Sequence, residues 1–172
     1  MPNKSLSIEQ ILTLLGETPT RLEALTASLA SQRLRIAPNQ DEWSANDVLA
    51  HLRACSDVWG GCIMAILAEE RPTLRAINPR TWIKQTDYLE REFRPSLQAF
   101  AAQRADLLEV LEVLTPEGWS RAATVTGAGK VLERTVLFYA DWLARHERPH
   151  VKQIERIVNT FSKEQRPTYT SS

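Results

Sequence analysis

Cysteine is scarce in this 172-residue sequence, which contains only Cys55 and Cys62. We predict that both lie on one helix, where a separation of two turns corresponds to a rise of about 10 Å. The Cα atoms of a disulfide lie within about 7 Å of each other, so the two thiols cannot form an intrachain disulfide. A chain without disulfides is typical of a reducing compartment, and we therefore expect a cytoplasmic protein.

An excess of one charge and long apolar runs are also missing. The sequence has 21 Lys and Arg residues against 21 Asp and Glu residues, which gives a formal net charge of zero. Nucleic-acid-binding proteins carry a basic surface, so we expect no nucleic-acid partner. No stretch is apolar enough to cross a bilayer, and the N-terminus lacks the apolar core of a secretory signal. We therefore expect no membrane association. The partner that we expect is a small-molecule substrate.

Apolar residues at helical spacing are what the sequence does contain. Hydrophobic residues make up 43% of the chain, which is enough for one sizeable core. The apolar stripes predict helices at residues 7–30, 44–70, 87–114 and 131–161. The predicted fold is all-α, an antiparallel four-helix bundle with long inter-helix loops. We expect a single domain over residues 1–161 and a polar, frayed C-terminal tail over residues 162–172.

Local signals set the ends of the first two helices. Ser7 with Gln10 and Ser44 with Asp47 have the spacing of N-terminal capping boxes. Gly16 is expected to interrupt the first helix, because glycine commonly ends helices.

The connecting segments differ in character. Residues 31–43 and 71–86 are predicted loops, and the second is long enough to form a lid or a pocket wall. Pro95 is expected to kink or restart the third helix. Residues 115–119 form a predicted turn, and residues 120–130 could form a short hairpin or an irregular loop.

The three histidines, His51, His146 and His150, all fall on the apolar faces of predicted helices. Four residues correspond to about 400° of rotation, so His146 and His150 project from one face. A buried imidazole needs partners for its nitrogens, and a metal ion can be one of them. Three imidazoles with an open position are typical of a catalytic zinc site, and nitrogen ligands also suit Ni²⁺ or Fe²⁺. The alternative is that the histidines are core residues hydrogen-bonded to their neighbours.

The segment from His146 to His150 also matches the H-E-x-x-H pattern of zinc proteases, in which Glu147 would be the general base. The extended form of that pattern requires a glycine and a histidine where Gln153 and Arg156 stand. Proline inside a helix removes a hydrogen bond, and Pro149 lies within this segment. These differences disfavour a protease, and Pro149 predicts an irregular helix beside His150.

A di-iron bundle is a second alternative for the same histidines. Glu147 and His150 form one Glu-x-x-His pair, but that fold requires a second pair on another helix. Val48 stands where the glutamate before His51 would be needed, so a dinuclear site is disfavoured.

Two stretches of the sequence carry a resemblance to a known family. They are Trp43-Ser44-Ala45-Asn46-Asp47-Val48-Leu49-Ala50-His51-Leu52 and His146-x-x-x-His150-x-x-Gln153-Ile154. Together they resemble the DinB/YfiT superfamily of four-helix-bundle proteins, and the resemblance covers roughly residues 7–160. The metal ligands of that family are one histidine early in the second helix and an H-x-x-x-H pair in the last helix. The resemblance therefore implies a mononuclear metal site at His51, His146 and His150.

The resemblance also implies a range of activities. Members of the superfamily are described as metal-dependent enzymes, and they include thiol transferases that use bacillithiol or mycothiol, glutathione-linked isomerases and hydrolase-like proteins. Dimers are common among them. A low-molecular-weight thiol is therefore an implied cofactor, and a homodimer is the implied assembly.

Two residues near the histidines are candidates for catalysis. Glu147 could act as a base, although we favour a solvated salt bridge with Arg148 or a neighbouring helix. Tyr139 lies two turns before the histidine pair and could stabilise an oxyanion, although we favour core packing. Cys55, one turn after the first histidine, could be a fourth ligand, and we favour a small core residue.

Two hypotheses for the function follow from these observations. In the first, one divalent metal, Zn²⁺ or Ni²⁺ or else Fe²⁺, supports a thiol transferase or hydrolase that acts on a small electrophilic substrate. In the second, the protein is a metal-free dimeric helical bundle with a binding or stress-associated role and no catalysis.

Overall fold

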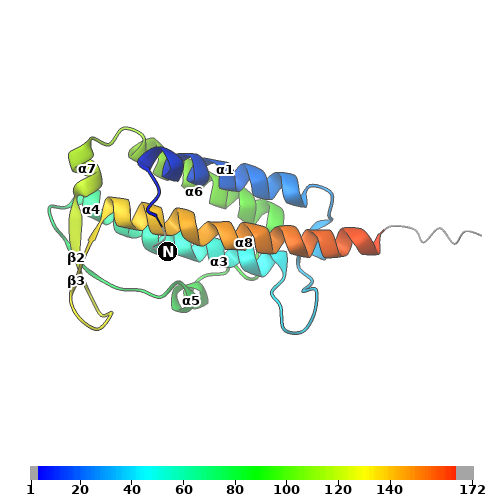
Figure 1. Cartoon of the computed structure of the whole chain (residues 1–172). Helices are drawn as coiled ribbons and strands as arrows, with labels where there is room; N and C mark the ends of the chain where they lie inside the picture. Colours follow the sequence, from blue (N-terminus) through cyan, green and yellow to red (C-terminus); the bar gives the residue numbers. More distant parts are fainter. Residues whose placement is uncertain (1–3, 166–172) are drawn as a thin grey trace, which may run out of the picture.

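Four long helical segments run side by side in the computed structural model, which describes residues 4–165 (Figure 1). They are α1 (Ile8–Thr26), α3 (Ala45–Cys55) with its continuation through η1 (Ser56–Gly60) and α4 (Gly61–Ala68), α6 (Phe93–Leu111), and α8 (Val136–Glu164). Helices α1 and α8 run in one direction, whereas α3 and α6 run in the other. Both α6 and α8 contact α1 as well as α3, so the four segments enclose a common core. The predicted all-α four-helix bundle is confirmed.

Shorter elements fill the connections. They are α2 (Ser31–Leu34), β1 (Thr73–Arg75), α5 (Pro79–Trp82), η2 (Ile83–Gln85), α7 (Pro116–Ser120), β2 (Ala122–Thr126) and β3 (Leu132–Thr135). Strand β2 pairs antiparallel with β3 and parallel with β1 in a three-stranded sheet. The hairpin of β2 and β3 corresponds to the hairpin alternative for residues 120–130. The expectation that the two long connections would be pure loops is wrong, because they contain α2, β1, α5 and η2.

The starts of the first two long helices agree with the sequence. Both predicted capping boxes form, at Ser7 with Gln10 and at Ser44 with Asp47. The third helix begins at Phe93 rather than near residue 87, which puts Pro95 in its first turn, where no backbone N–H is needed.

Helix α8 differs from its prediction at both ends and in the middle. It begins at Val136, because residues 132–135 form strand β3, and it continues to Glu164. Residues 162–164 are therefore helical, and the predicted tail from residue 166 onward lies outside the described residues. The helix is also continuous through Pro149, so the predicted irregularity there is wrong. Every helix among residues 4–165 falls short of the length or the apolar character that crossing a bilayer requires.

Helix α1 is also continuous, so the predicted interruption at Gly16 is wrong. Pro19 lies inside the helix and has no N–H, which leaves the carbonyl of Leu15 without its usual helical donor. Arg104 on α6 supplies the missing donor, since its Nη1 lies 3.0 Å from that carbonyl oxygen. A contact from another helix therefore compensates for the proline within α1.

The long connection between α4 and α6 has a geometric reason. Since α3 and α6 run in the same direction, the chain must return along the bundle before α6 can begin (Figure 1). The 24 residues from Ala45 to Ala68 correspond to roughly 36 Å of helix, so the return path is long. Helix α5 lies on this path and packs against α3.

A buried polar layer divides the core into two apolar clusters. It contains one side chain from each long segment: Thr18, Ser56, Arg104 and Glu147. The side chains of Arg104 and Glu147 are 2% and 1% exposed and form an ion pair. Glu147 also accepts a hydrogen bond from Thr18 at 2.9 Å, and Arg104 donates one to Ser56 at 3.1 Å. The two apolar clusters lie on either side of this layer, with Leu15 in one and Leu22 in the other.

We predict that Arg104→Met or Glu147→Leu alone lowers the free energy of unfolding by about 3–5 kcal/mol, because each leaves an uncompensated buried charge. The double variant should recover most of this loss, since it removes both charges. Urea unfolding of the metal-free protein measures all three. The exposed pair Arg21–Glu155, at 3.6 Å, provides the control, and Arg21→Met should cost less than about 1 kcal/mol. A double variant no more stable than either single variant would contradict the pairing.

Candidate metal centre

The two neighbouring helices α3 and α8 bring the three histidines together. His51 lies two turns after the cap of α3, and His146 and His150 lie one turn apart on α8. The Nε2 atom of His146 is 3.0 Å from Nε2 of His51 and 3.2 Å from Nε2 of His150. The ring centroids of the three pairs are 4.8–5.3 Å apart. Residues almost a hundred positions apart in sequence therefore meet as one cluster.

These distances are compatible with ligation of one ion. Two nitrogens at about 2.0–2.1 Å from a tetrahedral metal lie roughly 3.3 Å from each other. The other nitrogen of His150, Nδ1, lies 3.0 Å from the side-chain oxygen of Gln153. Since a carbonyl oxygen only accepts, Nδ1 carries the proton and Nε2 of His150 presents a lone pair. Nε2 of His146 can then donate to only one of its two neighbours, so hydrogen bonding alone leaves one lone pair facing another nitrogen.

The electrostatic surroundings keep two of the imidazoles neutral. Burial lowers the pKa of His51 from 6.5 to about 4, helped by the charges of His150, His146 and Arg80. Burial also lowers the pKa of His146 to about 4, helped by His150 and Arg80. Both rings therefore have unprotonated nitrogens at neutral pH, which is the state that metal ligation requires.

A thiol also approaches the cluster. Cys55 is fully buried, and its Sγ lies 3.5 Å from Nε2 of His51. The ligand atoms of His51, Cys55 and His146 all lie within 4.8 Å of one another. Burial, followed by the charge of Glu147, raises the pKa of the Cys55 thiol to about 12. These three side chains are one set of possible metal ligands among the described residues, and His150 adjoins the set through Nε2 of His146.

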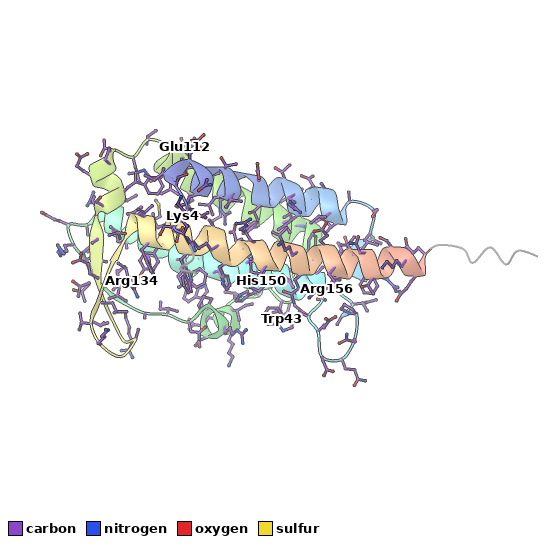
Figure 2. All side chains as sticks on the ribbon, viewed as in Figure 1. Lys4, Trp43, Glu112, Arg134, His150 and Arg156 are labelled. Carbon is purple, nitrogen blue, oxygen red and sulfur yellow. The ribbon has the colours of Figure 1, made fainter. Side chains whose placement is uncertain are left out.

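Two tryptophans border the histidines. The ring of Trp43 contacts His51 edge to face at 5.4 Å between centroids, and Trp59 contacts His146 in the same way at 4.9 Å. The guanidinium of Arg80 on α5 lies 5.8 Å from the ring centroid of Trp43. Trp43 and His150 are found on the same side of the bundle as α5 (Figures 1 and 2). The return connection therefore reaches the edge of the cluster.

The two candidate catalytic residues, Glu147 and Tyr139, are both buried in the bundle. The favoured ion pair of Glu147 with a neighbouring helix forms, with Arg104 of α6, but the prediction that it would be solvated is wrong, because both side chains are buried. The favoured core position of Tyr139 agrees with the structure, in which the residue is 7% exposed and hydrogen-bonds to Cys62. Glu147 therefore belongs to the polar layer, and Tyr139 belongs to the core.

A cavity lies between η1 and α6, away from the histidines. It has a volume of about 430 Å³ and is lined by residues that include Asp57, Gly61 and Trp82, but by none of the three histidines. The Asp57 carboxylate accepts hydrogen bonds from Trp82 Nε1 at 3.0 Å and Tyr88 Oη at 2.6 Å, which ties the return connection to the bundle. Asp57 lies in η1, a π-helical turn, and such turns occur often at functional sites. Sequence periodicity gave no signal for this turn.

Three comparisons with known proteins agree with this architecture. The model of the DinB superfamily matches residues 14–154, a range that contains all three histidines. A protein of Halalkalibacterium halodurans named "Putative metal-dependent hydrolase" is 28% identical over 148 residues, which cover 85% of this chain and 82% of that protein. The structure of YfiT from Bacillus subtilis, described as a probable metal-dependent hydrolase with an unusual four-helix bundle topology, has a TM-score of 0.74 and 19% identity. That similarity covers 94% of this chain and 93% of YfiT. The chain therefore belongs to the DinB superfamily.

Proposed function

We propose that the protein is a metal-dependent enzyme in which His51, His146 and His150 bind one divalent cation. The convergence of the three Nε2 atoms, at 3.0 and 3.2 Å from the central nitrogen, carries this proposal. Nitrogen ligands suit Zn²⁺, Ni²⁺ or Fe²⁺. Similar proteins that carry the names "Putative metal-dependent hydrolase" and "probable metal-dependent hydrolase" support the same chemistry here.

The reaction that we propose is hydrolysis or thiol transfer on a small electrophilic substrate. A bound divalent cation at such a site acts as a Lewis acid and lowers the pKa of a bound water or thiol. The residues of the chain have separate roles around it. Gln153 holds the ring of His150 through Nδ1, and Trp43 and Trp59 fix the other two rings by edge-to-face contacts. Arg80, at the edge of the cluster, adds positive charge where an electron-rich substrate group would enter.

The protein purified without a histidine tag should contain close to one divalent metal per chain, and His146→Ala should lose it. The reason is that His146 is the central member of the cluster. Elemental analysis and calorimetric titration with Zn²⁺, Ni²⁺ and anaerobic Fe²⁺ measure the binding. Lys152→Ala is the control, since this exposed residue lies on the same helix and outside the cluster.

Activity of the metal-loaded protein separates the two reaction types. Small electrophiles, such as activated esters and epoxides, are incubated with and without a low-molecular-weight thiol. Turnover without the thiol indicates hydrolysis, and turnover only with the thiol indicates transfer. Unchanged metal content in His146→Ala, or a wild-type protein that binds none of the three metals, would contradict the proposal and favour a metal-free binding protein.

We predict that Gln153→Leu weakens metal binding by about 10–100-fold, a typical effect of removing a residue that orients a ligating histidine. The substitution removes the acceptor for Nδ1–H of His150 without touching the ion. Gln153→Glu keeps an acceptor and should retain most of the affinity. Calorimetric titration of both variants measures the difference, and equal affinities would show that Gln153 does not orient the ring.

The stability of the metal-free protein should fall as the pH falls from 6.5 towards 4, the interval between the ordinary and the lowered pKa of His51 and His146. In this interval the unfolded chain takes up protons that the folded protein does not, so acid favours unfolding. The contribution is fully present above pH 6.5. Urea unfolding across this range should give a smaller decline for His146→Asn than for wild type. Equal declines would argue against the lowered pKa of His146.

A further inference from the structure

The Cys55 thiol is close to a nitrogen that already has another neighbour. Its Sγ lies 3.5 Å from Nε2 of His51, and the same nitrogen lies 3.0 Å from Nε2 of His146. A neutral imidazole nitrogen offers one lone pair or one N–H, so it makes one strong hydrogen bond in its ring plane. Two polar atoms therefore converge on a nitrogen that can satisfy only one of them well, and a cation among the three would interact with all of them.

Three of the distances among these atoms have the lengths of edges in a coordination polyhedron, and the ligand atoms of His51, Cys55 and His146 all lie within 4.8 Å of one another. In a tetrahedral zinc site with a Zn–S bond of about 2.3 Å and Zn–N bonds of about 2.0–2.1 Å, the S···N edges are roughly 3.6 Å and the N···N edges roughly 3.3 Å. The observed edges are 3.5 Å for Cys55 to His51 and 3.0 and 3.2 Å for the two histidine pairs. Cys55 is 0% exposed and follows His51 by one helical turn, so its side chain is held on the face of the cluster.

We propose that Cys55 is a fourth protein ligand, so that the cation is held by three imidazole nitrogens and one thiolate sulfur. This inference rests on the proposed metal site. When the metal–sulfur bond forms, the S–H bond breaks and its proton leaves to the solvent, with no change in oxidation state. Thiolate ligands favour zinc and other soft metals over Mg²⁺ and Mn²⁺, so this ligand set selects a zinc-like ion.

A thiolate ligand has a consequence for the proposed reaction. Four protein ligands complete a tetrahedral site, which is the arrangement of closed zinc sites. A substrate or a small thiol would then reach the ion only if Cys55 leaves or if the coordination number rises to five. Cys55 would therefore control access to the metal, in addition to influencing which metal is bound.

Substitution with Co²⁺ tests the ligand directly. The full-length protein without a tag is stripped with a chelator and titrated with Co²⁺ under anaerobic conditions. A thiolate ligand gives a sulfur-to-cobalt charge-transfer band in the near ultraviolet, whereas nitrogen and oxygen ligands give only the weaker visible bands of the ion. Wild type and Cys62→Ser should show the band, and Cys55→Ser should lose it while keeping the visible bands. Cys62 is the matched control, because it is the only other cysteine and lies two turns away.

The spectra separate this inference from the proposal on which it rests. Visible cobalt bands at one ion per chain, without the charge-transfer band in wild type, would overturn ligation by Cys55 and leave the three-histidine site standing. No binding of Co²⁺ or Zn²⁺ to wild type would contradict the metal site itself. A charge-transfer band that persists in Cys55→Ser and disappears in Cys62→Ser would show that Cys62 is the sulfur ligand and would overturn ligation by Cys55. If Cys55→Ser does not fold, wild type and Cys62→Ser decide the matter together, because a band that persists in Cys62→Ser can come only from Cys55.

Discussion

The buried ion pair between Arg104 and Glu147 is the interaction on which the arrangement of the bundle depends. A charge in an apolar core is costly unless it is paired and hydrogen-bonded, so these two side chains can be buried only when their helices are in register. Their partners extend that requirement to α1 through Thr18 and to η1 through Ser56. A shift of any long helix by one turn would break part of this network. Apolar contacts on either side tolerate such shifts more easily, because they are not directional.

The same layer fixes the position of the histidine cluster. Glu147 directly follows His146 in the chain, and Ser56 directly follows Cys55. The contacts that hold Glu147 in place therefore also hold His146 in place. In the same way, the contact of Ser56 holds the end of α3 that carries Cys55 and His51. Helix α8 uses two adjacent faces, because one face carries the ion pair and the other carries the imidazoles. Pre-positioning of this kind is what a ligand set needs in order to bind a metal without rearranging the backbone.

The sequence predicted the features that depend on local spacing. Caps at Ser7 and Ser44 need only a side chain three residues before a backbone N–H, and the inward faces of the histidines follow from helical periodicity. The partner of Glu147 could not be read in this way, because Arg104 lies 43 residues away. A signal was nevertheless present, since Arg104 falls on the apolar stripe of its helix and a buried arginine needs a buried acid. The π-helical turn and the directions of the helices depend on contacts across the whole bundle, which no short stretch of sequence encodes.

Changes in the return connection between α4 and α6 have different effects from changes in the bundle. The bundle supplies the histidine cluster and the polar layer, whereas the connection supplies α5, Arg80 and the side chains that donate to Asp57. Substitutions or insertions in the connection alter what borders the cluster without disturbing the register of the long helices. Loops on a rigid scaffold tolerate such variation far better than packed helices do. The shared direction of α3 and α6, which made a long return necessary, thereby gives this fold a segment in which the border of the histidine cluster can change while the histidines themselves stay in place.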